Sequence, residues 1–382
     1  MHENIRDHYE IVIIGAGPAG VSTAVELAKK GKKVVVIEKD YSSNTKTSGI
    51  IISNTLLYLS YLYNRLKTKT SSFLSISNEI NLEASFDLKK MRKYLENTTT
   101  KIFKAYKEDL NDHNVEVIEA TASFIDNNVL QLTFNNKNTK KITFDKSVIA
   151  TGSTPKSLPF AMGKKYIDPI NIINLEKIPS SITIIGGGFV GIEYATIFKR
   201  LGSNVTIVEA RDRILYTFDE FIIKKFEEYL KKDGINIIKS KTVNNIEKIG
   251  HKCILFMGDE KIESEEVFIA VGRIPNLKPL NIDSASIEMD GNYPVLDKSL
   301  KSVSNKNIYF AGDAAGKYLF LNWANYSAEI IVNDILGNKS DEFIFTFPKT
   351  LYTDPEIASI GLTESEAYEM GCDYGVIKYS FS

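Results

Sequence analysis

The feature that most constrains the fold is a sequence pattern that occurs twice. In the first copy, an apolar run over 11–14 leads into the glycine pattern G-x-G-x-x-G, a helical stretch over 21–30 and a second apolar run that ends in Glu38. The second copy begins at Ser181 and ends in Glu209. In both copies the acid follows the first glycine by 23 positions. Each copy is therefore predicted to form a strand, a tight turn, a helix and a second strand.

Each glycine of the pattern has its own physical reason. The first permits the tight turn, the second lets a pyrophosphate approach the backbone, and the third lets the helix pack closely on the sheet. The free N–H groups at the helix N-terminus then face the phosphates, and the acid accepts hydrogen bonds from a ribose diol. The sequence thus predicts two dinucleotide sites. Their glycines are Gly15, Gly17 and Gly20 in the first copy and Gly186, Gly188 and Gly191 in the second.

Three further apolar runs, over 148–155, 268–276 and 307–316, also end in short turns that contain glycine. The order of these runs and of the two glycine loops resembles that of the pyridine nucleotide–disulphide oxidoreductase family, whose members include dihydrolipoyl dehydrogenase, mercuric reductase and the soluble transhydrogenase. The segment 347–367 looks like the opening of that family's dimer-interface domain. The turns supply further candidate cofactor-binding residues, namely Thr151, Gly152, Gly272, Gly312 and Asp313.

The resemblance implies an α/β fold with two doubly wound, Rossmann-like domains, in which the NAD(P) domain is inserted in the FAD domain. It places the FAD-binding domain at 1–157 and 275–345, the NAD(P)-binding domain at 158–274 and a truncated α+β interface domain at 346–382. It implies FAD in the first glycine loop and NAD(P)H in the second. It also implies a homodimer, unless the short interface segment means that the contact is made differently.

The resemblance gives two acidic residues specific roles. Asp313 ends a strand, where its carboxylate suits the ribityl hydroxyl groups of a flavin, or else it caps a turn or a helix. A helix expected near 322–336 would point its positive N-terminal end toward the flavin. Glu209 favours NADH, because a carboxylate hydrogen-bonds a ribose 2′-hydroxyl and repels a 2′-phosphate. Arg211 and Arg213 either soften that preference or are solvated charges of a loop.

The segment after Glu38 lacks the redox-active cysteine pair of the family. When the family's C-x4-C pattern is laid on it, Thr45 and Ile50 fall at the cysteine positions and Asn54 at the position of a family lysine. The chain's two cysteines, Cys253 and Cys372, are expected to be small, buried or half-buried hydrophobic residues. The chain also stops before the His–Glu pair of disulphide-reducing relatives. Reduction of a disulphide is therefore not expected.

Two residues of the second copy are candidate catalytic residues. Glu193 matches the glutamate that pairs with the family lysine near the flavin. With neutral Asn54 in place of that lysine, the glutamate either takes up a proton or finds another donor. Phe189 matches an aromatic gate over the nicotinamide pocket of some relatives, or else it is an ordinary packing residue.

Composition narrows the setting in which the protein works. The formal net charge is −1, so nothing electrostatic points to nucleic acid or to an anionic membrane. The first residues are charged and lack the apolar segment of a secretory signal. No apolar run approaches the roughly 18 residues that a membrane span needs. A cytoplasmic location is therefore expected, in keeping with the low cysteine content.

Together these features predict an FAD-dependent NAD(P)H oxidoreductase, with NADH favoured. Hydride would pass from the nicotinamide to the flavin, and the electrons would continue to a small-molecule acceptor other than a disulphide. The alternative is a degenerate FAD- and NAD-binding protein of the dihydrolipoyl dehydrogenase-like family that binds nucleotides without turnover. Intact nucleotide loops are compatible with both functions.

Overall fold

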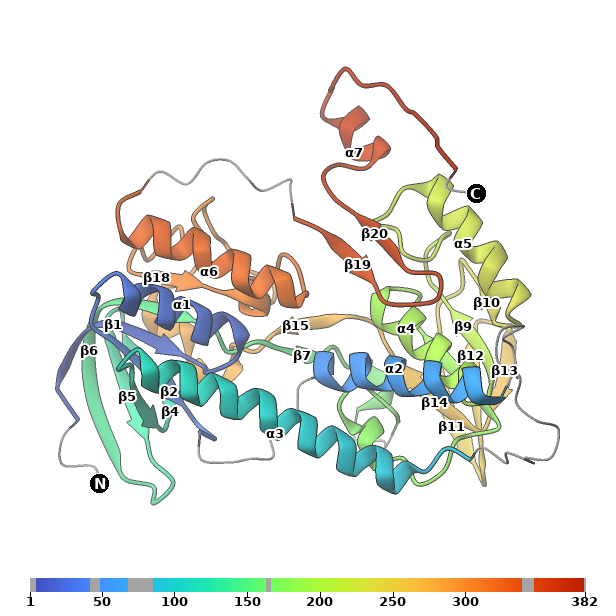
Figure 1. Cartoon of the computed structure of the whole chain (residues 1–382), viewed down its shortest axis with the longest axis horizontal. Coiled ribbons are helices and arrows are strands. Elements are labelled where there is room, and N and C mark those ends of the chain that lie inside the picture. Colours follow the sequence, from blue (N-terminus) through green and yellow to red (C-terminus); the bar gives the residue numbers. More distant parts are fainter. Residues whose placement is uncertain (1–4, 42–48, 68–84, 163–165, 339–346, 381–382) are drawn as a thin grey trace. The chain divides into compact units, whose positions relative to one another are not determined.

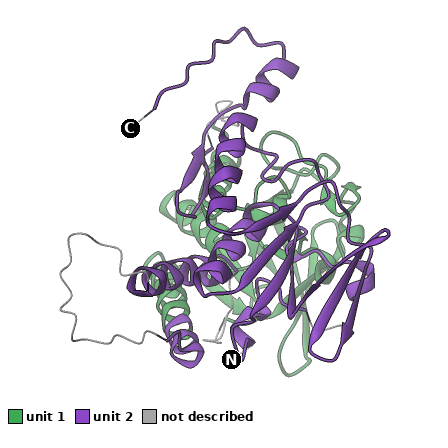
Figure 2. Ribbon diagram, turned by 90° about the vertical axis from the view of Figure 1, so that its right-hand side faces the viewer, with its two compact units in different colours: residues 1–46, 96–154, 273–343 green, residues 47–95, 155–272, 344–382 purple. Residues whose placement is uncertain are grey.

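The chain folds into two compact units, each made of three segments (Figure 2). The first comprises 1–46, 96–154 and 273–343, and the second comprises 47–95, 155–272 and 344–382. The long middle segment of the second unit lies between two segments of the first, so the second is inserted in the first. The computed structural model describes residues 5–41, 49–67, 85–162, 166–338 and 347–380 (Figure 1).

The first unit is built on a sheet with the strand order β3-β2-β1-β6-β5-β4, and β18 also pairs with β6. Strands β1, β2, β3, β6 and β18 pair in parallel, whereas β4 and β5 add an antiparallel edge. The central strands are near-continuous runs of valine and isoleucine because they are buried on both faces. The strands are β1 (His8–Ile14), β2 (Val34–Glu38), β3 (Glu116–Glu119), β4 (Thr121–Asp126), β5 (Val129–Thr133), β6 (Thr139–Ile149) and β18 (Ile308–Phe310).

Helix α1 (Pro18–Lys29) follows the first glycine loop, and α6 (Leu321–Ile335) packs against it (Figure 1). Gly17 is the N-cap of α1, and Pro18 stands at the first helical position, where its missing N–H is no loss. The sequence pattern predicts a start at 21, but Gly20 already lies in the first turn. The third glycine of the pattern is therefore a helical residue. Its position requires the absence of a side chain and not a turn conformation.

The second unit contains a parallel sheet with the strand order β10-β9-β8-β14 and an antiparallel sheet of order β11-β12-β13. Helix α4 follows β8 in the same way as α1 follows β1. The elements are β8 (Ser181–Ile185), α4 (Phe189–Arg200), β9 (Asn204–Val208), α5 (Glu220–Lys232), β10 (Asn236–Ile238), β11 (Asn245–Ile249), β12 (Lys252–Met257), β13 (Glu260–Ser264) and β14 (Glu266–Ile269).

Helix α2 (Gly49–Lys67) packs against α4 within the second unit. Leu56 and Leu57 of α2 share a buried apolar cluster with Ile192 and Ile197 of α4. The ends of β19 (Lys349–Leu351) and β20 (Ile357–Ser359) reach the same cluster. Full burial of such a leucine or isoleucine contributes about 1.5–3 kcal/mol, so this cluster holds the four elements together.

Helix α3 (Leu88–Asp112) is long and amphipathic, and its residues belong in part to each unit. All other remaining elements are short. The predicted α/β fold with two Rossmann-like units, one inserted in the other, is confirmed. The short elements are β7 (Ser153–Pro155), β15 (Arg273–Pro275), β16 (Met289–Asp290), β17 (Tyr293–Pro294), α7 (Glu364–Glu369) and the 3-10 turns 159–161, 171–174, 278–280, 282–285 and 312–315.

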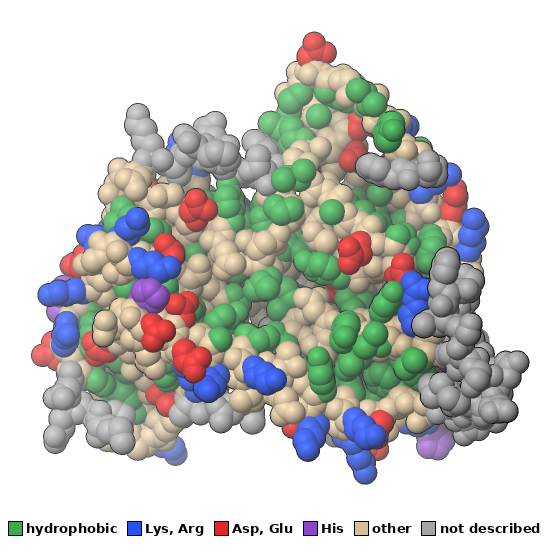
Figure 3. Space-filling model, in the orientation of Figure 1, with side chains coloured by type: hydrophobic (Ala, Val, Ile, Leu, Met, Phe, Trp, Pro, Cys, Tyr) green, Lys and Arg blue, Asp and Glu red, His purple; other side chains and the backbone are tan. Residues whose placement is uncertain are grey.

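The surface carries charges of both signs. Figure 3 shows acidic and basic side chains intermingled on the visible face, in keeping with the formal net charge of −1. Within the described ranges, none of the helices combines the length and the apolar character needed to cross a bilayer.

Candidate functional site

In the first glycine loop, two glycines are tightly packed and one faces open space. Gly15 has a φ of 110°, and a Cβ atom there would lie 2.5 Å from Ala150 O. At Gly20, a Cβ atom would lie 1.9 Å from Gly15 O, because α1 packs directly on the turn. At Gly17, by contrast, a Cβ atom would meet nothing within 4 Å. Two glycines thus serve the packing, and the third leaves the N-terminus of α1 open.

The acid at the end of β2 holds this loop in place. Glu38 Oε2 accepts a hydrogen bond of 2.7 Å from the backbone N–H of Ala16, the residue between the first two glycines. Its other oxygen accepts a longer bond of 3.3 Å from Asp40 N. The carboxylate therefore lies beside the loop, at the carboxyl end of a parallel strand, where ligands of such sheets bind.

The second glycine loop has the same geometry. A Cβ atom at Gly186 would lie 2.3 Å from Ala270 O, and one at Gly191 would lie 1.9 Å from Gly186 O, while the space beside Gly188 is open. Glu209 Oε2 accepts a hydrogen bond of 2.6 Å from Gly187 N. The two loops are thus built alike, each with a carboxylate that accepts a hydrogen bond from the loop backbone.

The loop that follows Glu209 is organised around one tyrosine. The guanidinium of Arg211 lies 3.4 Å from the centroid of the Tyr216 ring. Arg213 donates a hydrogen bond of 3.0 Å to Tyr216 O. Glu209 Oε1 in turn accepts a hydrogen bond of 2.8 Å from Arg211 N. Both arginines are thus engaged by Tyr216, and the carboxylate is fixed by backbone donors of its own unit.

A half-buried polar cluster lies at the strand ends of the first unit. Ser153 Oγ donates a hydrogen bond of 2.5 Å to Asp313 Oδ2. Arg273 donates to Ser153 twice, from Nε to Oγ and from a terminal nitrogen to the carbonyl oxygen, each at 2.7 Å. Burial raises the pKa of Asp313, although the Ser153 hydrogen bond and the charge of Arg273 favour the carboxylate. Thr151 Oγ1 is buried without a hydrogen-bond partner in the described part of the chain.

The other predicted glycines, Gly152, Gly272 and Gly312, directly precede the residues of this cluster in the sequence. Gly152 and Gly272 both have positive φ, and neither would bring a Cβ atom within 4 Å of a neighbour. Gly312 N donates to Ser327 Oγ at 2.8 Å, and Gly312 O accepts from the indole of Trp323 at 3.1 Å, so helix α6 anchors the turn that carries Asp313. Sequence reasoning selected the glycines but missed Ser153 and Arg273, although both stand directly after them.

Glu193 is a buried carboxyl group, and no lysine or arginine of the described residues pairs with it. It lies on α4 and is 8% exposed. Burial raises the pKa of Glu193 to about 7, although hydrogen bonds from the Tyr352 backbone and the Ser53 side chain favour the charged form. The partner on α2 is thus Ser53, not Asn54 as the family alignment suggests. Adjacent side chains of a helix point about 100° apart, so Asn54 faces a different direction from Ser53 and is exposed.

Phe189 is the first residue of α4 and packs on Phe218. The two ring centroids are 5.2 Å apart, and the rings are inclined by 38°. Phe218 is itself buried in the core of the second unit. This contact places Phe189 at the mouth of the second glycine loop, next to its N-cap Gly188.

No thiol pair lies near these groups. Ile50 stands in the first turn of α2, whereas Thr45 lies outside the described residues. Both cysteines of the chain are free. Cys253 is buried in β12, as expected, and burial raises the pKa of its thiol. The same expectation is wrong for Cys372, which is exposed because it follows the turn at Gly371 that ends α7.

Comparison with known proteins identifies this arrangement. Residues 9–329 match the family described as Pyridine nucleotide-disulphide oxidoreductase, and residues 347–382 match the dimerisation domain of the same family. The chain belongs to this family. The family is one of FAD-dependent oxidoreductases that act on NAD(P)H.

The relatives differ in the substrate they reduce or oxidise. The chain is 31% identical to dihydrolipoyl dehydrogenase of Bacillus subtilis, over 97% of this chain and 81% of that protein. It is 30% identical to mercuric reductase of Lysinibacillus sphaericus, over 96% of this chain and 67% of that protein. Among solved structures, the HOCl-induced flavoprotein disulfide reductase RclA of Escherichia coli, as its Cu(II) complex, superposes with a TM-score of 0.80 at 26% identity. That match covers 96% of this chain and 80% of RclA.

Proposed function

We propose that the protein is an FAD-dependent NAD(P)H oxidoreductase that delivers electrons to a small-molecule acceptor other than a disulphide. The observation that carries the proposal is the combination of two complete glycine loops with Ile50 in the first turn of α2. A disulphide route needs a thiolate, and isoleucine cannot provide one. Cys253 is buried in β12, and Cys372 is exposed beyond α7. Neither cysteine therefore replaces the missing pair.

The residues of the first unit fit FAD. The open space beside Gly17 lets a pyrophosphate approach the free N–H groups of α1. The buried hydroxyl of Thr151 would gain the hydrogen-bond partner that the described protein atoms do not give it. Asp313 and Ser153 present a carboxyl and a hydroxyl group suited to a polyol. Bound FAD would supply the chemistry of accepting a hydride from nicotinamide and passing on its electrons.

We assign the second loop to NADH. Glu209 places a carboxylate beside the loop, where it would hydrogen-bond a ribose 2′-hydroxyl and repel a 2′-phosphate. Arg211 and Arg213 are both engaged by Tyr216, which weakens the case that they bind a 2′-phosphate. Phe189, beside the N-cap of α4, is the residue that we assign to the nicotinamide end of the site.

Glu193 is our candidate for handling protons. With a pKa of about 7, its carboxyl group holds a proton in part of the molecules at neutral pH. The Ser53 hydroxyl and the Tyr352 amide fix its position without neutralising its charge. Such a group can accept or release a proton as electrons pass through the site, which a permanently ion-paired glutamate does less readily.

The first experiment is a flavin spectrum of the purified protein. We expect a yellow protein whose flavin absorbance bleaches when NADH is added without oxygen and returns when dichlorophenolindophenol is added. Lipoamide and glutathione disulphide should not restore the colour. A protein reoxidised by a disulphide would contradict the assigned acceptor class.

The cysteines provide a direct check on the electron route. We expect a variant with Cys253→Ala and Cys372→Ser to reduce dichlorophenolindophenol at the rate of the unmodified protein. Loss of dye reduction in a variant that still binds FAD would show that a thiol takes part. A colourless protein that cannot be reconstituted with FAD would instead favour the degenerate nucleotide-binding alternative.

A further inference from the structure

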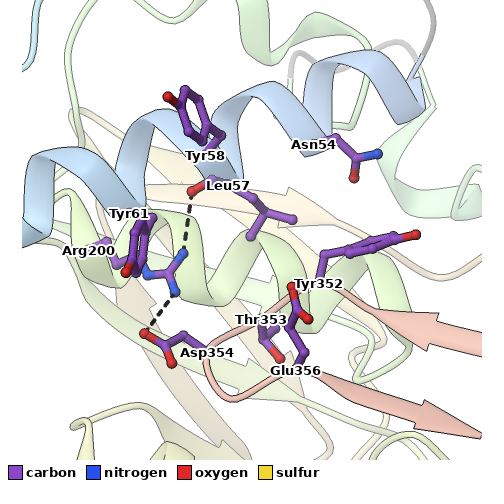
Figure 4. A pocket seen from close by; sticks show the side chains of 9 residues that line it. All are labelled: Asn54, Leu57, Tyr58, Tyr61, Arg200, Tyr352, Thr353, Asp354 and Glu356. Carbon is purple, nitrogen blue, oxygen red and sulfur yellow. Dashed lines mark hydrogen bonds and ion pairs between the residues drawn. The ribbon is translucent and has the colours of Figure 1, made fainter.

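The second unit contains a pocket that belongs to neither nucleotide loop. It has a volume of about 540 Å³. Residues of α2, the last residue of α4 and the turn between β19 and β20 line it, and three of the lining residues are tyrosines (Figure 4). A pocket of this size holds a small aromatic molecule.

A buried guanidinium forms one wall of this pocket. The side chain of Arg200 is 8% exposed. Among the described residues it donates one hydrogen bond, a long one of 3.4 Å, to Leu57 O. The nearest carboxylate oxygen, Asp354 Oδ2, is 3.8 Å away, beyond hydrogen-bonding distance (Figure 4). A guanidinium has five N–H donors in a planar fork, so most of its capacity is unused.

The acidic partner of Arg200 is loosely held. The side chain of Asp354 is 52% exposed, and it faces the guanidinium without forming the two parallel hydrogen bonds that a carboxylate and an arginine can make. Burial disfavours the charged form of Arg200 and lowers its pKa, an effect that Asp354 only partly offsets. A carboxylate that entered the pocket could bind the fork more closely than Asp354 does, while Asp354 turned out into water.

The remaining walls suit an aromatic body. The ring of Tyr61 lies under the guanidinium of Arg200, 5.5 Å from it. Tyr58 is 54% exposed and Tyr352 is 49% exposed, which is high for rings of this size. Flat rings stack favourably on such side chains. Glu356 also borders the pocket, so a ligand with one negative charge fits better than one with two.

We propose that this pocket binds a small aromatic monocarboxylate, with its carboxylate on Arg200 and its ring between the tyrosines. The carboxylate of Asp354 occupies part of the anion's place in the structure and competes with it. Tyr352 borders this pocket and also donates its backbone N–H to Glu193, but binding in the pocket does not depend on the function proposed above.

The test uses 2-naphthoate as the probe and 2-naphthamide as its uncharged counterpart. Binding is measured by calorimetry on the full-length protein saturated with FAD and NAD⁺, so that the nucleotide sites are filled. We expect naphthoate to bind and naphthamide to bind at least tenfold more weakly. Arg200→Lys, which keeps the charge but loses the fork, should weaken naphthoate binding by roughly tenfold.

Asp354→Asn gives the result that distinguishes this proposal from others. Removal of the competing negative charge should tighten naphthoate binding by about three- to tenfold, as expected for a like charge about 4 Å away. The matched control is Lys225→Gln, because the Lys225 side chain is 65% exposed on α5 and does not line the pocket. Naphthoate affinity should not change in that variant.

Three results would overturn the proposal: no naphthoate binding at millimolar concentration, equal affinity for naphthamide, or unchanged or weaker binding in Asp354→Asn. If Arg200→Lys does not fold, the Asp354→Asn measurement still decides. A tightening by the asparagine variant supports the proposal without any variant of the buried residue.

Discussion

At the scale of single residues, two glutamates of the second unit are buried among its described residues, and their surroundings differ. Glu227 is 7% exposed and accepts hydrogen bonds of 2.9 and 3.1 Å from Lys239 Nζ. Glu193 is 8% exposed, but its donors are the neutral Ser53 hydroxyl and the Tyr352 amide. A buried carboxylate without a cation is costly to ionise, and the protein therefore binds a proton there more tightly than the unfolded chain does.

This difference predicts how stability depends on pH. The pKa of Glu193 is about 7 in the folded protein and 4.5 ordinarily. Its contribution to the free energy of unfolding is therefore fully present below about pH 4.5 and is lost as the pH rises through 7, by about 3 kcal/mol in total. Glu193→Gln should remove this part of the decline, as measured by urea unfolding at a series of pH values.

Glu227→Gln is the control for placing an amide at a buried glutamate position. It should destabilise the protein, because it leaves Lys239 without its carboxylate, and it should leave the decline due to Glu193 in place. Equal pH dependence in the Glu193→Gln variant and the unmodified protein would contradict the assignment.

The second prediction at this scale concerns nucleotide preference. Glu209→Gln removes the negative charge but keeps an oxygen that can accept from Gly187 N. Discrimination against NADPH should fall by roughly five- to tenfold, because a charge repulsion at about 4 Å in water is about 1 kcal/mol. The ratio of kcat/KM for NADH to that for NADPH measures this effect.

Glu38→Gln is the matched control, since Glu38 makes the same contact in the other unit, to Ala16 N. We expect it to weaken the retention of FAD and to leave the NADH-to-NADPH ratio unchanged. A change of that ratio in Glu38→Gln would mean that the two loops have been assigned to the wrong nucleotides.

At the scale of elements, Gly191 and Gly188 of the second glycine loop should respond to substitution in different ways. At Gly191, a methyl group would lie 1.9 Å from Gly186 O, so Gly191→Ala must push α4 away from the loop. We expect a loss of about 1–3 kcal/mol in the free energy of unfolding, as in other overpacked sites. Thermal unfolding of the purified variant measures it.

Gly188→Ala should behave in the opposite manner. Its methyl group meets nothing within 4 Å of the protein and points into the space assigned to the pyrophosphate. The melting temperature should change little, whereas NADH should bind at least roughly tenfold more weakly, a loss of about 1.4 kcal/mol. Weak NADH binding together with a large loss of stability would show that Gly188 serves the fold and not the ligand.

The sequence predicts elements better than it predicts their neighbours. The repeated pattern identified both strand–helix–strand units, because glycine spacing and apolar runs are local properties. It placed the start of α1 at 21 and not at Pro18, because a glycine inside a helix looks like part of a turn. It left open whether Glu193 takes up a proton or finds another donor in place of the family lysine, and it did not identify Ser53, which the turn of α2 directs to the carboxyl group. A shift of one residue on a helix changes which side chain faces a partner, and periodicity alone does not identify that partner.

At the scale of the whole molecule, contacts between distant segments create the pocket beside Arg200. Residues of α2, Arg200 at the end of α4 and the turn at 352–356 come together only because both neighbours pack on α4. No motif marks these residues. An arginine in the last turn of a helix is usual, because it complements the helix dipole, and its burial depends on segments more than a hundred residues away.

The last part of the chain presents apolar side chains that a single unit does not cover. Tyr368 is 77% exposed, Met370 is 57% exposed and Ile377 is 92% exposed. They lie within the match to the family's dimerisation domain at 347–382. Exposed apolar groups in such a segment are typical of a protein interface. We expect a homodimer in solution, with these side chains buried between the two copies.

Charge reversal of this surface tests the dimer. Met370→Asp combined with Ile377→Asp should convert a species of two chains to one of a single chain in sedimentation velocity experiments. Ile249→Asp is the control, because Ile249 is 60% exposed but lies on β11, outside the match. Dissociation by the control variant, or a dimer that persists in the double variant, would contradict this interface.

The hydrogen bonds from the glycine loops to Glu38 and Glu209 have a consequence for how nucleotide choice can evolve. Under the assignments proposed above, each of these carboxylates would recognise a ribose and would also hold the turn beside it in place. A small side chain in place of either carboxylate would remove this hydrogen bond as well as the nucleotide preference. The loop would then become less rigid as its selectivity decreased. A lineage that moves from NADH to NADPH must therefore find a new acceptor for the Gly187 amide before, or together with, a new cation for the phosphate.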